Sequence, residues 1–361
     1  MKKVCLIFNH FRHQDGVGRS ALAVANMLTS MKYAEVTLIP IYTDEKEFHQ
    51  LLEPGIKVKH IFGFYFQGMP HVVDRLPLSW INAKIKPGEY DVVIGFQFGL
   101  SIRCVAAANL RKDILKLAWM HGYDYGLVLK SQYEVIGKVI CVSRHNSEKL
   151  KSELPSIQID YNYNPIDETV VQKCGNEPID IIQPKEGPLF VTVGRMSPEK
   201  GFERLLKAFK RLKDEGYIFT FWLIGDGPDF AKLQLKMNEM GLEDRVKFLG
   251  QQSNPHKYTA KADVFVCSSF SEGYSTACTE AIMLGVPVIT TDVSGAEEII
   301  RDAGCGIIVD NDDDSIYRGL KEILSQPQMI EEWKVILKTT RERFYAETRI
   351  QRLVNILKLN E

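Results

Sequence analysis

The sequence predicts an α/β fold with two domains, each built around a doubly wound parallel sheet. Three observations predict it: short apolar runs alternate with amphipathic stretches, the alternation pauses once near the middle of the chain, and it then starts again. The chain has 361 residues, of which 45% are hydrophobic and 25% charged, so two domains can each bury a core. We therefore expect two Rossmann-like domains that face each other across a cleft.

The first domain is expected over residues 1–168. Its buried strands are predicted at VCLIF, EVTLIPI, DVVIGF, ILKLAWM and KVICVS, and the amphipathic stretch SALAVANMLTSM is predicted to be a crossover helix. Apolar runs followed by helical patterns are typical of parallel strands covered on both faces. Ligands of such sheets bind at the carboxyl ends of the strands.

The second domain is expected over residues 188–340, after a linker at 169–187 where polar residues, prolines and glycines gather. Its strands are predicted at LFVTVG, FTFWLIG, RVKFLG, DVFVCS, PVIT and GIIV. The stretch FERLLKAFKRLKDEG is predicted to be an amphipathic helix that stops near Gly216. Residues 341–361 are expected to hold a helix that crosses back to the first domain, although its apolar pattern suits packing without that crossing equally well.

Composition excludes some partners and favours a location. The formal net charge of -1 argues against nucleic acid, although residues 1–175 hold 21 Lys+Arg against 17 Asp+Glu. That basic excess is either chance surface variation or a sign that the first half approaches an anionic partner such as a membrane. The seven cysteines lie singly in apolar runs, as expected of buried thiols in a reducing compartment. No apolar run is long enough to span a membrane. We therefore expect a cytoplasmic protein, with the inner face of the cytoplasmic membrane as one location.

Two loops after predicted strands carry residue types suited to phosphate. The first strand is followed by a glycine loop with Gly16 and Gly18 at the start of a helix, where backbone amides favour an anion. A glycine turn without any ligand is an equally good interpretation of this loop. After LFVTVG, Arg195 offers a bidentate donor for phosphate and Lys200 a point charge beside a helix start, unless both are ordinary surface cations.

The stretch SEGYSTACTEAIMLG places two carboxylates on either side of a predicted helix start. A helix is expected from near Thr276 to near Leu284, so backbone amides suited to phosphate should be exposed at Gly273, Tyr274, Ser275 and Thr276. Glu272 precedes that anion site and Glu280 lies more than one turn into the helix. Carboxylates accept hydrogen bonds from hydroxyl groups, so a sugar at Glu272 and a ribose at Glu280 would satisfy both. This pattern favours a nucleoside diphosphate sugar. Alternatively, Glu272 is solvated and Glu280 only favours the early helix through its dipole.

Several motifs together resemble glycosyltransferase family 4, the retaining enzymes of the GT-B fold, of the type found in bacterial surface-polysaccharide synthesis. They are E-G-Y-S-T-A-C-T-E-A, V-G-R-M-S-P-E-K-G and I-G-D-G-P, supported by D-G-V-G-R, by His121 in W-M-H-G-Y-D and by N-P-I-D. The resemblance covers almost the whole chain. Asp15 stands where a glycine is common, and Pro165 replaces a glycine, so the shapes of those two loops are expected to differ from the family's.

The resemblance implies a role for each matching residue. In the second domain Glu280 would bind the ribose, Arg195 and Lys200 the diphosphate, Glu272 the sugar hydroxyls, and the loop 273–276 would supply backbone donors. The base would meet the backbone near Phe248 and Leu249. From the first domain, Gly16 with Gly18 would close on the phosphate, and His121 would lie beside the sugar as a positioning group.

The implied reaction is the retaining transfer of a hexosyl or N-acetylhexosaminyl group, most simply from a UDP-sugar, to a hydroxyl of a glycan or lipid-linked acceptor. No metal or other cofactor is expected, because cationic side chains and helix amides stabilise the leaving diphosphate. The run 310–314, although acidic, is interpreted as a solvated turn and helix N-cap. A sugar-nucleotide epimerase or hydrolase of the same fold, and a sugar-nucleotide binding protein without turnover, are alternatives.

The acceptor is expected to meet the first domain. The segment HIFGFYFQGMPHVVDRLPLSW sets Phe62, Phe64, Tyr65, Phe66 and Trp80 among Lys57, Lys59, Arg75, Lys84 and Lys86. Such a surface suits a lipid-linked acceptor or a peripheral membrane contact. Ordinary packing of these rings in the core is the alternative.

Overall fold

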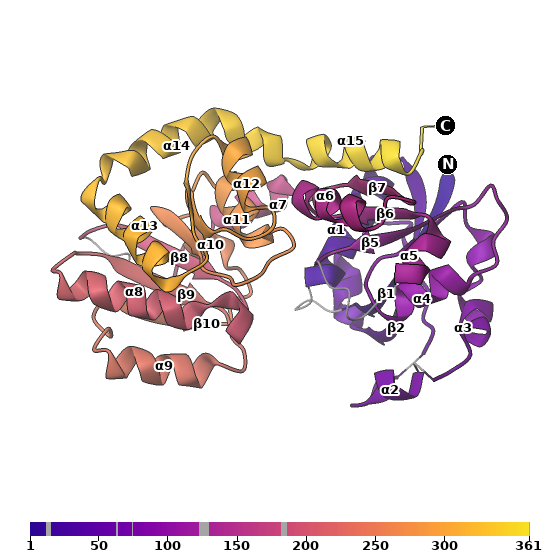
Figure 1. The fold of residues 1–361 in the computed structure, drawn as a ribbon, viewed down its shortest axis with the longest axis horizontal. Helices are drawn as coiled ribbons and strands as arrows, with labels where there is room; N and C mark the ends of the chain where they lie inside the picture. Colours follow the sequence, from indigo (N-terminus) through magenta and orange to yellow (C-terminus); the bar gives the residue numbers. More distant parts are fainter. Residues whose placement is uncertain (12–15, 63, 74, 123–129, 182–185, 361) are drawn as a thin grey trace. The chain divides into compact units, whose positions relative to one another are not determined.

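The computed structural model describes residues 1–11, 16–62, 64–73, 75–122, 130–181 and 186–360 (Figure 1). The chain divides into two compact units. Unit 1 joins Met1–Pro165 to Ala346–Glu361, and unit 2 is Ile166–Tyr345.

Unit 1 is built on a parallel sheet of seven strands in the order β3-β2-β1-β4-β5-β6-β7. The strands are β1 (Lys2–Phe11), β2 (Ala34–Asp44), β3 (Lys57–Val58), β4 (Val92–Gly95), β5 (Leu115–Met120), β6 (Lys138–Cys141) and β7 (Gln158–Tyr161). All five predicted strands are present. The edge strands β3 and β7 were not predicted, because they are short and carry too few apolar residues to show a pattern.

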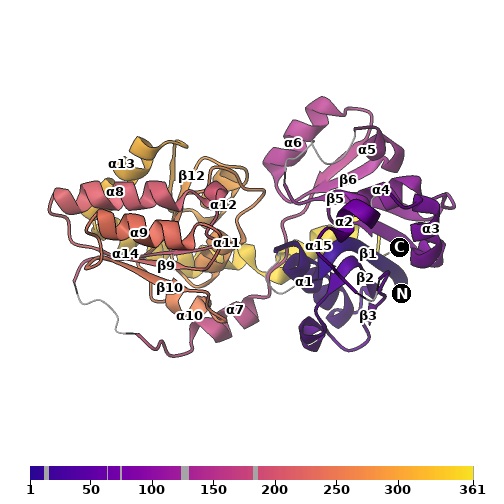
Figure 2. The ribbon, with the colours of Figure 1, turned by 90° about the horizontal axis from the view of Figure 1, so that it is seen from below.

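Helices cover both faces of this sheet. Figures 1 and 2 show α1 and α15 together on one face and α3, α4 and α5 on the other, in agreement with the helix contacts. The helices of unit 1 are α1 (Gly16–Ser30), α2 (Met69–Val73), α3 (Leu78–Ile85), α4 (Leu100–Ala107), α5 (Lys130–Ile136), α6 (Arg144–Glu153) and α15 (Ala346–Ile356), with short 3₁₀ turns at Lys46–Leu51 and Pro87–Glu89. Between the sheet and α3–α5 lies a core of aliphatic side chains with Tyr42, Tyr90 and Tyr133.

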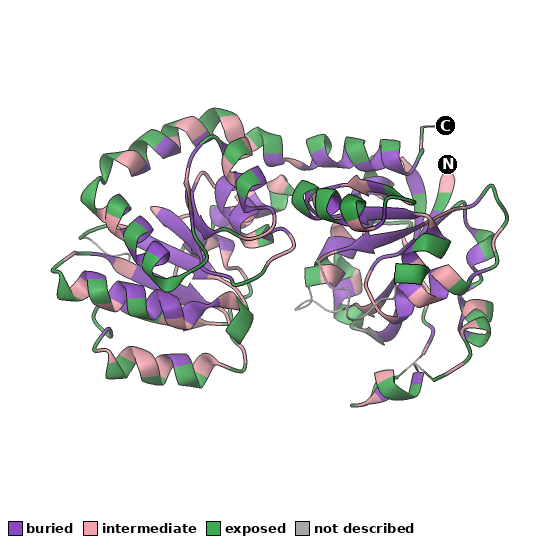
Figure 3. Cartoon of the chain, viewed as in Figure 1, coloured by how far each residue is buried: buried purple, intermediate pink, exposed green. Residues whose placement is uncertain are grey.

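Unit 2 is built on a parallel sheet of six strands in the order β10-β9-β8-β11-β12-β13. The strands are β8 (Leu189–Val193), β9 (Thr220–Ile224), β10 (Val246–Gly250), β11 (Val264–Cys267), β12 (Val288–Thr291) and β13 (Ile307–Val309). All six predicted strands are present, and the predicted fold class of two doubly wound parallel sheets is confirmed. The four inner strands β9, β8, β11 and β12 are buried along most of their length (Figure 3), whereas the edge strands β10 and β13 are mostly only partly buried.

The helices of unit 2 also lie on both faces of their sheet. Helices α8, α9 and α13 cover one face, and α11, α12 and α14 cover the other (Figures 1 and 2). The bounds are α7 (Glu168–Gly175), α8 (Phe202–Asp214), α9 (Phe230–Glu239), α10 (His256–Thr259), α11 (Thr276–Met283), α12 (Ala296–Ala303), α13 (Asp313–Ser325) and α14 (Gln328–Thr340), with 3₁₀ turns at Pro198–Lys200 and Arg341–Phe344.

Helix α8 shows how the sequence pattern becomes structure. Leu205, Phe209 and Leu212 lie on one helical face and are fully buried, as the 3.6-residue period predicts. Gly216 follows the helix with φ of 84°, the left-handed conformation that glycine adopts without strain and that ends many helices.

The division into units differs from the boundaries expected from the sequence. The segment 169–187, interpreted above as a linker, begins with helix α7 and groups with unit 2. Asp167 caps this helix by accepting hydrogen bonds from the amides of Thr169 and Val170 at 2.9 and 3.2 Å. Helix α7 packs against α10 and α11 and buries Val171, whereas its polar residues face outward. A short helix with a polar face resembles a linker in sequence.

The last helix groups with unit 1. Helix α15 contacts α1, and Lys138 Nζ donates to the carbonyl oxygen of Ile356 at 2.9 Å. Arg349 Nη1 donates to the carbonyl oxygen of Asn164 at 2.9 Å. These bonds and the buried residues Ile350, Leu353 and Val354 hold the helix to unit 1. Throughout the described part of the chain, every helix is too short or too polar to span a bilayer.

Candidate functional site

The candidate site of unit 2 lies where the order of its strands reverses. Strands β8 and β11 are neighbours in the sheet although β9 and β10 lie between them in sequence. The chain therefore leaves the carboxyl ends of β8 and β11 in opposite directions, into the loops 194–201 and 268–275. Doubly wound sheets bind their ligands at such a point.

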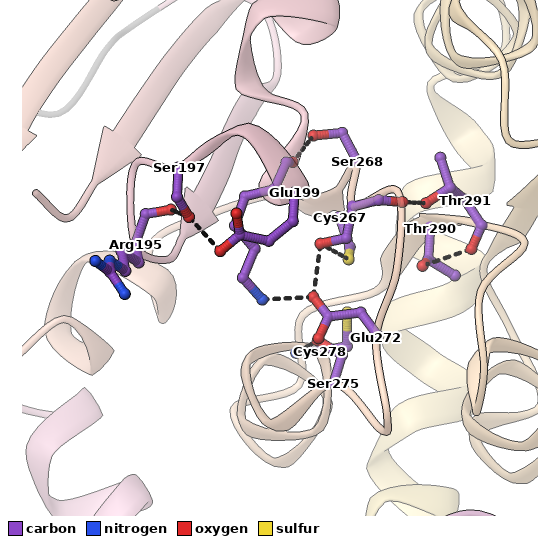
Figure 4. Close-up of polar contacts among 12 residues, drawn as sticks. Arg195, Ser197, Glu199, Cys267, Ser268, Glu272, Ser275, Cys278, Thr290 and Thr291 are labelled. Carbon is purple, nitrogen blue, oxygen red and sulfur yellow. Dashed lines mark hydrogen bonds and ion pairs between the residues drawn. The ribbon is translucent and has the colours of Figure 1, made fainter. Parts of the chain in front are cut away.

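An ion pair joins the two loops. Lys200 Nζ lies 2.7 Å from Glu272 Oε1, and the Ser269 hydroxyl donates to the same oxygen at 2.6 Å (Figure 4). The two charged side chains are 28% and 13% exposed, so both are largely withdrawn from water. Burial by itself lowers the pKa of Lys200, but the neighbouring Glu272 carboxylate outweighs it and the net pKa is raised. Lys200 therefore stays cationic, and a cation and an acceptor lie side by side.

Helix α11 begins next to this pair, as predicted. Ser275 is its N-cap, and the Ser275 hydroxyl accepts a hydrogen bond from the amide of Cys278 at 3.3 Å. The Tyr274 side chain is buried against Gly295. These two side chains serve the fold, so what the predicted loop 273–276 offers to an anion is its backbone amides at the helix start.

The second glutamate lies further along the helix. Glu280 Oε2 is 4.0 Å from His256 Nδ1, and the two side chains are 12% and 10% exposed. His256 opens the short helix α10 and was not singled out in the sequence, where a lone histidine has no recognisable pattern. Glu272 lies in the loop before α11, and Glu280 lies within the helix, so the two glutamates stand on either side of the helix start.

Buried groups fix the loop that carries Lys200. Ser268 Oγ donates to the carbonyl oxygen of Lys200 at 2.9 Å, and the amide of Phe270 donates to the carbonyl oxygen of Glu199 at 2.8 Å. Arg204, 2% exposed, donates through Nε to the carbonyl oxygen of Ser268 at 2.8 Å. A side chain at Gly201, where φ is 66°, would lie 2.3 Å from that same oxygen. Sequence reasoning missed Arg204, because a polar residue on an amphipathic helix gives no sign of burial.

The motif I-G-D-G-P acts on the same loop from the other side. The amide of Met196 donates to the carbonyl oxygen of Asp226, and the amide of Asp229 donates to the carbonyl oxygen of Met196, both at 2.9 Å. A Cβ atom at Gly225 would lie 1.9 Å from the carbonyl oxygen of Gly194, so only glycine permits this approach. This motif therefore positions the loop that carries Arg195 and Lys200.

The other predicted donor residues of unit 2 lie apart from the ion pair. Arg195 is exposed, and its guanidinium points away from the Glu272 carboxylate (Figure 4). Phe248 and Leu249 lie on the edge strand β10, which β9 separates from β8. The Phe248 ring packs edge-to-face on Phe230 at 5.7 Å.

The predicted residues of unit 1 follow β1 and β5. Gly16 is exposed and Gly18 buried in the first turn of α1, after β1, which adjoins β4 at the strand-order reversal of this unit. Asp15 lies outside the described residues. His121 directly follows β5, and its Nε2 is buried without a hydrogen-bond partner among the residues that the structure describes. Burial lowers the pKa of His121 to about 3. This effect outweighs a hydrogen bond with the backbone of Phe96, which by itself raises the pKa. The imidazole is neutral at physiological pH.

The acidic run 310–314 forms a helix start. Asp312 is the N-cap of α13, and its Oδ1 accepts from the amide of Ser315 at 2.8 Å, as predicted. Asn311 Nδ2 donates to the carbonyl oxygen of Phe270 at 3.0 Å, which ties this run to the loop after β11. Through this hydrogen bond the run helps to hold the loop that carries Glu272.

Comparison with solved structures identifies the class of fold. The structure resembles WaaG, a glycosyltransferase involved in lipopolysaccharide biosynthesis, with a TM-score of 0.71 and 15% sequence identity. The match covers 98% of this chain and 99% of the WaaG chain. The structure also resembles HepE of Anabaena in complex with UDP over 99% of this chain and 100% of the other, with a TM-score of 0.73 and 18% identity. The fold is that of the GT-B glycosyltransferases.

Comparison of sequences is more specific for unit 2. Residues 177–340 match the family model described as glycosyl transferases group 1. A segment of 184 residues is 31% identical to the N-acetylgalactosamine-N,N'-diacetylbacillosaminyl-diphospho-undecaprenol 4-alpha-N-acetylgalactosaminyltransferase of Campylobacter jejuni. The match covers 50% of this chain and 48% of that protein. The matched segment thus spans about half the length of this curated relative.

Proposed function

We propose that this chain is a retaining glycosyltransferase of family 4 that transfers a sugar from a nucleoside diphosphate sugar to an acceptor hydroxyl. One observation carries the proposal: the partly buried Lys200–Glu272 ion pair lies at the strand-order reversal of unit 2, beside the start of α11. A cation and helix amides suit the diphosphate, and a carboxylate suits sugar hydroxyls.

Each part of the donor then has a matching group on unit 2. The diphosphate binds Lys200 and the amides at the start of α11, and it draws in the exposed Arg195 side chain. The donor sugar places hydroxyls against Glu272, and the ribose places its hydroxyls against Glu280. The base lies along the backbone near Phe248 and Leu249. In unit 1, Gly16 and Gly18 contact the phosphate, and neutral His121 accepts a hydrogen bond from the sugar through Nε2.

The chemical step is substitution at the anomeric carbon on a single face. The bond from that carbon to the diphosphate oxygen breaks, and the leaving diphosphate takes the electron pair. The acceptor hydroxyl oxygen bonds to the same face, and its proton passes to the leaving phosphate. Lys200 and the α11 amides stabilise the charge that grows on the phosphate, where one well-placed donor contributes on the order of 3 kcal/mol. We propose that this suffices without a metal.

The donor and acceptor are proposed from chemistry and from relatives. A UDP-sugar is the proposed donor, since HepE, which shares the fold, was solved with UDP. A hexosyl or N-acetylhexosaminyl group and a glycan or lipid-linked acceptor are proposed, since the Campylobacter relative is named for a diphospho-undecaprenol substrate. Bacterial surface polysaccharide, including lipopolysaccharide and capsule, is the proposed product class. The free cysteines fit a cytoplasmic location, where thiols stay reduced.

Calorimetric titration with UDP, GDP and ADP tests the donor site. We expect UDP to bind most tightly, and a Glu280→Gln variant to bind it less tightly, because the ribose loses its charged acceptor. Incubation with radiolabelled UDP-sugars and short glycan acceptors then tests transfer, and the anomeric coupling constant in the product tests retention.

The outcomes separate the alternatives. Release of free sugar or of an epimer at the same rate with and without acceptor indicates a hydrolase or epimerase. Tight binding with no turnover of any sugar indicates a binding protein. Failure of all three nucleotides to bind would remove the basis for a nucleotide-sugar site in unit 2.

A further inference from the structure

Unit 1 carries exposed aromatic side chains that its own core does not use. Of the five exposed Phe, Tyr and Trp side chains in the described parts of the chain, four lie between residues 64 and 80. They are Phe64 at 66%, Tyr65 at 41%, Phe66 at 48% and Trp80 at 43% exposure. Aromatic rings clustered in this way on a soluble unit mark an interaction surface.

The exposure does not arise from a shortage of apolar residues for the core. Helix α2 turns Met69 and Val73 inward, at 1% and 2% exposure, and leaves Val72 54% exposed. Helix α3 buries Ile81 and Ile85 completely and presents Trp80 on the outside. Each helix thus has one apolar face in the core and further apolar groups in water, which costs free energy unless something covers them.

Ring contacts link these groups in pairs. The Phe64 and Phe66 rings stack with centroids 6.4 Å apart, and Trp80 meets Phe62 at 6.0 Å. Lys84, one helical turn after Trp80, holds its Nζ 5.0 Å from the Trp80 ring centroid. We call Phe62, residues 64–68, α2 and α3 together the aromatic surface.

The charge around the aromatic surface is predominantly positive. The sequence from 54 to 88 holds five Lys and Arg residues against a single acidic residue, whereas the whole chain has a net charge of -1. Lys57, Arg75, Lys84 and Lys86 are exposed. Aromatic rings that insert at the interface, flanked by cations that attract anionic headgroups, are the side chains by which proteins bind membrane surfaces.

We propose that the aromatic surface docks unit 1 onto an anionic lipid bilayer. The Tyr65 ring packs against His10, 5.8 Å away near the end of β1, so the surface adjoins the strand-end edge of unit 1. A lipid-linked acceptor is thereby held close to that edge. This surface goes beyond the donor chemistry proposed above, and docking requires neither nucleotide nor turnover.

Co-sedimentation with vesicles of phosphatidylcholine alone and of phosphatidylcholine with 30 to 40% phosphatidylglycerol tests this proposal. We expect binding to the anionic vesicles only, weakened by salt because the attraction is screened beyond about 8 Å at physiological ionic strength. The Lys84→Glu variant should bind at least about fivefold more weakly, since each basic residue near the surface contributes about that factor. The Phe64→Ser/Phe66→Ser variant should lose about tenfold or more.

Matched controls come from unit 2. Leu235→Ser/Val335→Ser removes two apolar side chains that are 59% and 61% exposed, and Lys338→Glu reverses one exposed charge. Both controls should bind anionic vesicles as the wild type does. Thermal melting and UDP titration of every variant show whether it is folded, so loss of donor binding is scored separately from loss of docking.

Three results would overturn the proposal. The first is that the wild type fails to bind anionic vesicles. The second is that the aromatic and basic variants bind these vesicles as tightly as the wild type does. The third is that these variants lose no more binding than the unit 2 control variants lose. If the wild type elutes as a dimer in gel filtration and Phe64→Ser/Phe66→Ser elutes as a monomer, the surface joins two copies of this chain and the lipid proposal fails.

Discussion

Replacing Lys200 by alanine removes the cation of the proposed donor site and leaves its partner carboxylate behind. Glu272 is 13% exposed, and among the described residues its Oε1 would keep only the Ser269 hydroxyl as a partner. Breaking a fully buried pair costs about 3–5 kcal/mol. Since Lys200 is 28% exposed and water can partly replace it, we expect a loss of about 1–2 kcal/mol in the free energy of unfolding.

The effect on transfer should be larger than the effect on stability. A single charged donor at the leaving group contributes about 3 kcal/mol, so kcat/KM for the donor should fall by about 10²–10³. Stability is measured by thermal melting, where a loss of about 1–2 kcal/mol lowers the Tm of a unit of this size by roughly 2–8 °C. Transfer is measured from a radiolabelled UDP-sugar at a temperature well below that Tm.

A matched control separates the site from general surface charge. Lys210→Ala removes a partly exposed lysine of α8 that pairs with Asp214 within the same helix. It should leave kcat/KM within about twofold of the wild type, since exposed pairs of this kind contribute little. If Lys200→Ala also retains kcat/KM within about threefold while remaining folded, the assignment of Lys200 to the leaving diphosphate is wrong.

Three further predictions follow from the geometry. Glu280→Gln should raise the donor KM about tenfold with kcat nearly unchanged in steady-state kinetics, because the ribose lies away from the bond that breaks. Ser275→Ala should cost about 1 kcal/mol by removing the α11 cap, a fall of about 2–4 °C in Tm by calorimetry. For His121, the folded pKa of about 3 lies below its ordinary 6.5, so the stability it contributes is present above pH 6.5 and lost as pH falls toward 3. Between pH 7 and pH 5 the wild type should lose about 2 kcal/mol more than His121→Asn in urea unfolding.

Each of these predictions has an opposing result. A fall in kcat with an unchanged donor KM in Glu280→Gln would move Glu280 to the reacting centre. An unchanged Tm in Ser275→Ala would mean that the cap adds nothing to α11, and Ser275→Thr, which keeps the hydroxyl, serves as the control. Parallel loss of stability with pH in His121→Asn and the wild type would show that the imidazole is not buried in its neutral form.

Much of the architecture follows from the local sequence. The alternation of apolar runs and amphipathic helices specifies eleven of the strands, since a strand covered on both faces requires an unbroken apolar run. The helix α11 was placed correctly from the hydroxyl residues before it and from Gly285 after it. Short edge strands such as β3 and the polar helix α7 bury few side chains and therefore leave no pattern in the sequence.

Sequence by itself determined which residue types stand at the strand ends, because the positions of Lys200 and Glu272 follow directly from the apolar runs before them. Tertiary structure alone decided which of these meet. Lys200 and Glu272 pair because β8 and β11 are neighbours across a reversal in strand order, a long-range fact that no local pattern records. The supporting groups Arg204 and His256 were likewise invisible, since a polar side chain shows its function only when the buried partner that compensates its loss of water is known.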